Sequence, residues 1–117
     1  MKLILLCCCL LALTGPLVAQ SPATYPSTAA KAHVGEYAHV VGEVADIYIT
    51  AKGDTFIHFD QPYPASDFSA VIFADDHDKF GDVTHLRSRT ITVTGTIRLY
   101  HDKAEIVLKR RAQLDAK

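Results

Sequence analysis

The stretch Thr90-Ile-Thr-Val-Thr-Gly-Thr-Ile-Arg-Leu-Tyr100 decides the fold class. One parity of this stretch holds polar residues, mostly threonines, and the other holds apolar residues. Alternation with a period of two predicts a β-strand that buries one face. An earlier segment, His39-Val-Val-Gly-Glu-Val44, repeats the pattern. The inward residues of the later copy are expected to be Ile91, Val93, Ile97 and Leu99.

Each copy of the pattern places a glycine in mid-strand at a buried-parity position, Gly42 in the first and Gly95 in the second. A residue without a Cβ lets a strand bend sharply or lets another part of the chain come close. A sheet that coils into a small barrel needs such corners. The two glycines are therefore expected to be barrel corners.

Residues 1–19 are predicted to be a secretory signal peptide. Lys2 precedes the apolar run Leu3–Leu13, and Ala19 supplies a small residue at the expected cleavage site. The run is too short to span a membrane, and Cys7 lies too early in it for a lipoprotein signal. We expect a periplasmic or secreted protein with no membrane anchor after cleavage.

Cleavage would remove all three cysteines, so the remaining 98 residues have no disulfide and no thiol chemistry. That length allows one domain with one modest core. Without Lys2 the chain has 11 basic and 13 acidic residues, a net charge of −2 with neutral histidines. This balance argues against strong non-specific binding of nucleic acid, which requires a basic surface.

The expected organisation is a flexible lead over Gln20–Ala32, which is rich in Ser, Pro, Thr and Ala, then a domain over 33–114 and a tail over 115–117. Within the domain, five strands are predicted: Glu36–Thr50, Thr55–Asp60, Phe68–Ala74, Thr90–Tyr100 and Lys103–Leu108.

Two of these strands and the connection before the fourth strand show further features. The buried parity of Glu36–Thr50 changes after Val44, which predicts a β-bulge. Both parities of Phe68–Ala74 are apolar, so its pattern leaves the buried face open. The connection Asp75–Leu86 has an apolar residue every third position, which is typical of a short helix or an irregular loop.

Three strands, a connection and two further strands form the order of an all-β, five-stranded OB-type Greek-key barrel with a short helix or loop between its third and fourth strands. An SH3-like barrel also has five strands. We do not expect it to separate the third from the fourth by a dozen residues.

The amino-acid sequences of several segments resemble those of a known family. Thr55–Asp60, Tyr63-Pro64, Phe68 and Val71-Ile72 are similar to a pattern of small exported bacterial OB-fold domains of the nucleic-acid-binding type, and the two Val-x-Gly-x-Val/Ile strands and Ile106–Leu108 match as well. The resemblance spans Val34–Leu114 and implies a nucleic-acid ligand. His58 stands where the pattern has Asn, and Asp60 stands where it has Gly. A second, similar group is formed by periplasmic OB-fold proteins linked to stress tolerance.

An OB barrel binds ligands on the face of its second and third strands and in two adjacent loops. Aromatic side chains on that face stack on bases, and lysines contact phosphates. The alternative is that the rings only cover the open side of the barrel and that the lysines are solvated. The predicted ligand-binding residues are Tyr48, Lys52, Phe56, His58, Tyr100, His101 and Lys103.

Other charged residues suggest two further kinds of site, a basic patch and a metal site. Lys109–Arg111, with Arg87 and Arg89, forms either a local basic patch or a solubilising end. The run Asp75–Asp78 and six histidines invite a metal site, but their spacing does not match one and no cysteine remains after cleavage, so we expect no metal and no cofactor.

A nuclease-like site would need converging carboxylates and opposed arginines. Asp46, Asp54 and Asp60 are candidates, but the arginines lie elsewhere in the sequence and no nucleophile motif is present. We therefore expect no catalytic residues and no enzyme activity.

The sequence thus predicts an exported OB-fold binding module that binds oligonucleotide or other nucleic acid weakly. The alternative is a periplasmic protein-interaction or stress-related OB-fold protein that binds a protein, glycan or small ligand. The candidate partners are single-stranded nucleic acid and a periplasmic protein, and the oligomeric state is left open.

Overall fold

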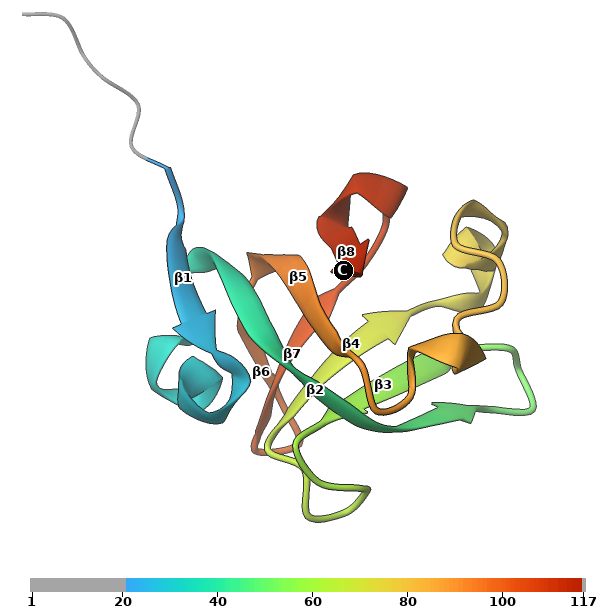
Figure 1. Ribbon diagram of the computed structural model, residues 1–117, viewed down its shortest axis with the longest axis horizontal. Coiled ribbons are helices and arrows are strands. Elements are labelled where there is room, and N and C mark those ends of the chain that lie inside the picture. Colours follow the sequence, from blue (N-terminus) through green and yellow to red (C-terminus); the bar gives the residue numbers. More distant parts are fainter. Residues whose placement is uncertain (1–20, 117) are drawn as a thin grey trace, which may run out of the picture.

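The computed structural model describes residues 21–116, so the predicted signal peptide lies outside the described residues. The described part contains eight strands and four short 3-10 helices (Figure 1). The strands are β1 (Ala23–Pro26), β2 (Tyr37–Ile49), β3 (Thr55–Phe59), β4 (Phe68–Ile72), β5 (Thr90–Thr96), β6 (Arg98–Tyr100), β7 (Lys103–Val107) and β8 (Leu114–Ala116). The helices are η1 (Ser27–His33), η2 (Ala74–Lys79), η3 (Thr84–Leu86) and η4 (Arg111–Gln113). None of the described helices has the length and apolar character needed to cross a membrane.

All eight strands belong to one coiled, open sheet with the order β6-β7-β4-β3-β2-β5-β8, and β1 pairs with β2. Most pairs are antiparallel, whereas β4–β7 and β1–β2 are parallel. The predicted all-β, OB-like class is confirmed. The predicted closed barrel of five strands differs from the structure, because the sheet stays open, β1 and β8 are added, and the segment Thr90–Tyr100 is divided into β5 and β6.

The predicted bulge in the first long strand is confirmed. The register of β2 against β3 shifts between Val44 and Asp46, so Ala45 is the extra residue. Before the bulge β2 pairs with β5, and after it β2 pairs with β3. One bent strand therefore connects the two halves of the coiled sheet (Figure 1).

The core forms where the inward parities of the strands meet. Phe68 and Ile72 of β4 belong to the core, whereas on the outer face Val71 is buried and Ser69 is half-buried. The later copy of the strand pattern ends earlier than expected, because the ladder breaks at Ile97 and Leu99 in β6 is 52% exposed. The largest fully buried side chains include Phe59, Phe68, Ile57, Ile72, Leu86, Ile91, Ile97, Ile106 and Leu108.

The two mid-strand glycines provide space for side chains from other elements. A Cβ on Gly42 would lie 1.9 Å from Ser27 Oγ, and a Cβ on Gly95 would lie 2.7 Å from Ile106 Cγ2. Both separations are far inside van der Waals contact. Of the two roles expected for these glycines, close approach is the one that the packing requires.

The segment predicted as a flexible lead forms β1 and η1 instead. Ser27 and Ala30 are buried, and Ser27 Oγ donates a hydrogen bond to Asp60 Oδ2 at 2.7 Å. Asp60 itself adopts a left-handed backbone with φ of 70°, a conformation that favours glycine. The Ser, Pro, Thr and Ala composition gave no sign of this order, because it arises from tertiary packing against Gly42.

The connection between β4 and β5 contains η2 and η3, and Gly81, with a φ of 68°, lies between them. The structure thus has two short 3-10 turns where the sequence predicted one short helix or a loop. The predicted apolar repeat is reflected in burial, because Val83 and Leu86 enter the core and Phe80 packs against it.

A polar and aromatic cluster fixes the start of the domain. The Tyr25 ring stacks on His33 with centroids 3.6 Å apart, and Glu36 accepts hydrogen bonds from the Tyr25 hydroxyl and from His33 Nδ1, the latter at 2.8 Å. The hydrogen bond from Tyr25 lowers the pKa of Glu36, and the same bond raises the pKa of Tyr25. The cluster therefore links β1 and η1 to the approach to β2.

This cluster predicts a pH-dependent contribution to stability. Because the pKa of Glu36 is lower in the folded chain, its contribution is present above the unfolded value of 4.5 and is lost as the pH falls through the folded value. Urea unfolding of the protein and of Glu36→Gln should give midpoints that differ near neutral pH and converge in acid, once the pH lies below the folded pKa of Glu36. A midpoint difference that is the same at both pH values would contradict this assignment.

Candidate ligand-binding groove

A straight row of polar residues crosses five strands on the outer face of the sheet. Each residue is the direct cross-strand partner of the next, so the row follows from the strand register. It is formed, in order, by Asp46 on β2, His58 on β3, Ser69 on β4, Glu105 on β7 and Arg98 on β6.

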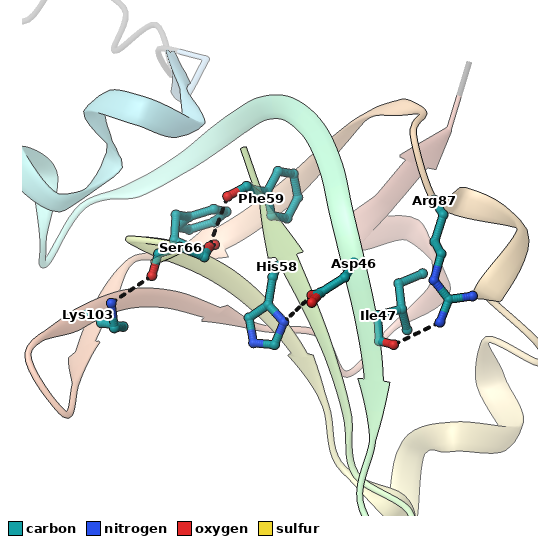
Figure 2. A network of polar contacts seen from close by, with 8 residues as sticks. Asp46, Ile47, His58, Phe59, Ser66, Arg87 and Lys103 are labelled. Carbon is teal, nitrogen blue, oxygen red and sulfur yellow. Dashed lines mark hydrogen bonds and ion pairs between the residues drawn. The ribbon is translucent and has the colours of Figure 1, made fainter. Parts of the chain in front are cut away.

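Each end of this polar row is occupied by a hydrogen-bonded pair of side chains. His58 Nδ1 lies 2.5 Å from Asp46 Oδ1, a distance at which the ring N–H donates to the carboxylate (Figure 2). Glu105 is only 5% exposed, and its Oε2 accepts from Arg98 Nε at 2.7 Å and Nη2 at 2.5 Å. The buried carboxylate is thus compensated, as burial of a charge requires. Ser69 lies between the two pairs, and its hydroxyl makes no hydrogen bond to another described residue.

Aromatic side chains surround the polar row. The Phe56 ring lies nearly parallel to His58, at 8° and 6.3 Å between centroids, and Tyr63 lies 5.6 Å from His58. Two adjoining hollows of about 490 and 610 Å³ share these three rings. Together they form one cleft, called here the aromatic groove, which extends from Tyr48 at one end to Tyr100 at the other.

The wall of the aromatic groove that carries Tyr63 is held in place by Lys103. Lys103 Nζ donates to the Ser66 carbonyl at 2.9 Å (Figure 2) and to the Pro64 carbonyl at 2.8 Å. The buried Ser66 Oγ lies at hydrogen-bonding distance from the carbonyls of Phe59 and Phe68. The Lys103 ammonium therefore fixes a loop, whereas the sequence suggested that it contacts phosphates.

The structure brings most of the predicted ligand-binding residues together. Six of them line the aromatic groove: Tyr48, Phe56, His58, Tyr100, His101 and Lys103. Lys52 is exposed in the turn after β2 and does not line the groove. The prediction omitted Tyr63, although Tyr63-Pro64 belongs to the family pattern. It also omitted Ser69 and Glu105, whose positions depend on register.

The other charged groups separate in space. Asp46 contacts His58, Asp54 accepts from the Ala74 amide at 2.9 Å, and Asp60 accepts from Ser27. The three carboxylates thus have unrelated partners. Among residues 21–116, no group of three or more His, Cys, Asp or Glu side chains is arranged to hold a metal ion.

The basic residues for which the sequence allowed either a local patch or a solubilising end are also divided. Arg87 Nη2 donates to the Ile47 carbonyl at 3.0 Å (Figure 2), and Arg111 Nη1 donates to the Leu114 carbonyl at 2.7 Å. Lys109 and Arg110 instead line a separate hollow of about 370 Å³.

No protein-family model and no curated protein matches this chain. Among solved structures, it is similar to a Leishmania major Friedlin protein classed as an aspartyl-tRNA synthetase, at 15% identity and a TM-score of 0.52 over 87% of this chain. The match spans 22% of that protein's length. The chain also matches the hypothetical protein ygiW from E. coli at 13% identity and a TM-score of 0.48, over 89% of this chain and 100% of the other. The first likeness shows a shared fold.

Proposed function

We propose that this chain is an OB-fold binding module that holds a short segment of single-stranded nucleic acid weakly in the aromatic groove. The observation that carries the proposal is the set of exposed rings along the groove, with Tyr63 69% and Tyr48 60% exposed. Bases stack on such rings at about 1–3 kcal/mol each, whatever their sequence. The likeness in fold to part of a protein named for tRNA supports testing nucleic acid first.

The charges of the aromatic groove determine the character of this binding. Lys103 is engaged by loop carbonyls, Arg98 is paired with Glu105, and Asp46 adds a negative charge. Few cations are left to displace the counterions of a phosphate backbone. Binding should therefore depend mainly on stacking, with low affinity and a shallow salt dependence.

The polar row supplies hydrogen-bonding groups beneath the rings. His58 is fixed by Asp46, and the hydroxyl of Ser69 lies next to it with both a donor and acceptor lone pairs available. A base that stacks on Phe56 or Tyr63 would present its edge toward these groups. Such contacts would orient a base without making the groove selective for one sequence.

The proposal predicts that the ring of Tyr63 matters and its hydroxyl does not. Tyr63→Ala should weaken binding of a labelled short oligothymidylate about tenfold, because one stacking surface is lost. Tyr63→Phe keeps the ring and should bind like the parent protein. Fluorescence anisotropy at low ionic strength measures both affinities. Equal affinities for the alanine and phenylalanine variants would count against stacking at this position.

A second candidate function follows from the same balance of charges. The aromatic groove also suits a protein, glycan or small ligand that carries little charge, as in the alternative periplasmic module. Exported proteins meet such ligands more often than nucleic acid, and export is part of the proposal. A pull-down with the purified protein from periplasmic extract separates the two candidates. A saturable protein partner that survives nuclease treatment, without oligonucleotide binding, favours the second.

A further inference from the structure

A second groove lies farther along the outer side of β7. Its residues come from the start of β2, the end of β5 and the segment that follows β7. Its lining includes Tyr37, Phe73, Val107, Lys109, Arg110 and Gln113, and its volume is about 370 Å³, within the range of about 300–1,000 Å³ typical of small-molecule sites. We call it the basic groove.

The basic groove differs from the aromatic groove in charge. No carboxylate lines it, whereas Glu105 and Asp46 line the two hollows of the aromatic groove. Lys109 and Arg110 are exposed, and neither side chain forms an ion pair with a described residue. Arg98 also lines the basic groove, but Glu105 neutralises it.

One further cation approaches the basic groove. Lys79 Nζ lies 3.3 Å from the Lys109 carbonyl, and Asp76 pairs with it at 2.8 Å. Its charge is therefore compensated. Two uncompensated positive charges remain at the groove, on Lys109 and Arg110.

The backbone that carries these two cations is fixed by a buried glutamine. Gln113 is 7% exposed, and its Oε1 accepts from the amides of Lys109 at 2.7 Å and Arg110 at 2.9 Å. Its Nε2 donates to the carbonyls of Thr94 at 2.9 Å and Val107 at 3.1 Å. The segment is thus anchored to both β5 and β7. Fixing the backbone before a ligand arrives reduces the entropy cost of binding.

Two rings complete the basic groove. Tyr37 is 52% and Phe73 is 37% exposed, and neither is covered by the rest of the domain. Lysine and arginine side chains recognise phosphate, and exposed rings recognise flat heterocycles. We propose that the basic groove binds a nucleotide unit, with Lys109 and Arg110 on its phosphate and Tyr37 or Phe73 against its base.

The first test uses the protein labelled with ¹⁵N and three probes: thymidine 5′-monophosphate, thymidine and inorganic phosphate. The nucleotide should shift the amide resonances of Thr96, Lys109 and Arg110 and bind more tightly than either part alone. If thymidine bound as tightly as the nucleotide, the cations would have no part in binding. If inorganic phosphate bound as tightly as the nucleotide, the rings would have none. Either result, or the absence of shifts, would overturn the proposal.

The second test compares variants. Lys109→Ala with Arg110→Ala should weaken nucleotide binding at least tenfold, whereas Lys31→Ala, which removes an exposed lysine elsewhere, should not change it. Both cations are exposed, so the variants should fold, and circular dichroism verifies this. An unchanged affinity for the nucleotide would exclude the cations from the site.

The basic groove does not depend on the aromatic groove. Tyr63→Ala should leave thymidine 5′-monophosphate binding unchanged, since that ring lies in the aromatic groove. The two proposals can therefore fail separately. An oligothymidylate that binds the basic groove more tightly than the free nucleotide would identify a strand as the source of the phosphate, and the reverse order would identify a free nucleotide.

Discussion

Replacing Gln113 with leucine is expected to lower the free energy of unfolding by about 3 kcal/mol. The four hydrogen bonds of the Gln113 carboxamide join β5, β7 and the segment after β7, where no strand ladder connects them. Leucine fills a similar volume but leaves two amides and two carbonyls without partners. Unsatisfied buried groups of this kind cost about 1–3 kcal/mol each, and access of water reduces the sum.

Urea unfolding measures the effect of Gln113→Leu, and Gln61→Leu provides the matched control because Gln61 is exposed. Gln113→Glu is expected to be destabilising as well, since its second carboxylate oxygen would face the carbonyls of Thr94 and Val107. A midpoint for Gln113→Leu equal to that of the Gln61 variant would show that the glutamine does not join the strands.

Gly42→Ala is expected to destabilise the domain by a similar amount, about 3 kcal/mol, because it overpacks a closed site. The new Cβ would lie 1.9 Å from Ser27 Oγ and 2.6 Å from Ser27 Cβ, and Phe59 blocks a shift at 3.0 Å. Ser27 does not rotate away freely, because its hydroxyl is bonded to Asp60.

A double-mutant cycle tests the origin of this effect. Ser27→Gly removes both clashing atoms, so the variant carrying Gly42→Ala and Ser27→Gly should be more stable than the sum of the single effects predicts. The coupling is read from urea unfolding of the four proteins. Strict additivity would mean that the glycine is needed for a reason other than the approach of Ser27.

Those features that depend on local periodicity were predictable from the sequence. The parity change after Val44 correctly predicted the bulge in β2, and alternation in Thr55–Asp60 correctly placed Phe56 and His58 on the outer face. The two-residue repeat also holds in β7, where Ile106 and its neighbours of the same parity are fully buried. In each case, the signal and the structure share a two-residue repeat.

Features that depend on distant contacts were not predictable in this way. Gln113 belongs to no predicted strand, and only the gap between β5 and β7 gives its amide four partners. Lys103 looked like a free cation, but the Pro64 carbonyl lies within its reach in the folded chain. Leu99 kept the parity of a core residue, yet the break at Ile97 leaves it exposed.

The candidate site lies between these two cases. Its aromatic residues could be predicted from the sequence, because they occupy outward positions on strands that bind ligands in this fold class. The polar row could not be chosen, since Ser69 and Glu105 are neighbours only through the parallel pairing of β4 with β7. The division of the basic residues into separate surfaces likewise follows from the fold.

The central claim is that the aromatic groove holds bases by stacking, and a titration of ¹⁵N-labelled protein with a short oligothymidylate tests it most directly. The predicted result is a set of shifted amide resonances at Tyr48, Phe56, His58 and Tyr63, with little effect from an abasic strand of the same length. The claim would be contradicted if the abasic strand shifted these resonances equally, or if a saturating concentration of the oligothymidylate left them unchanged.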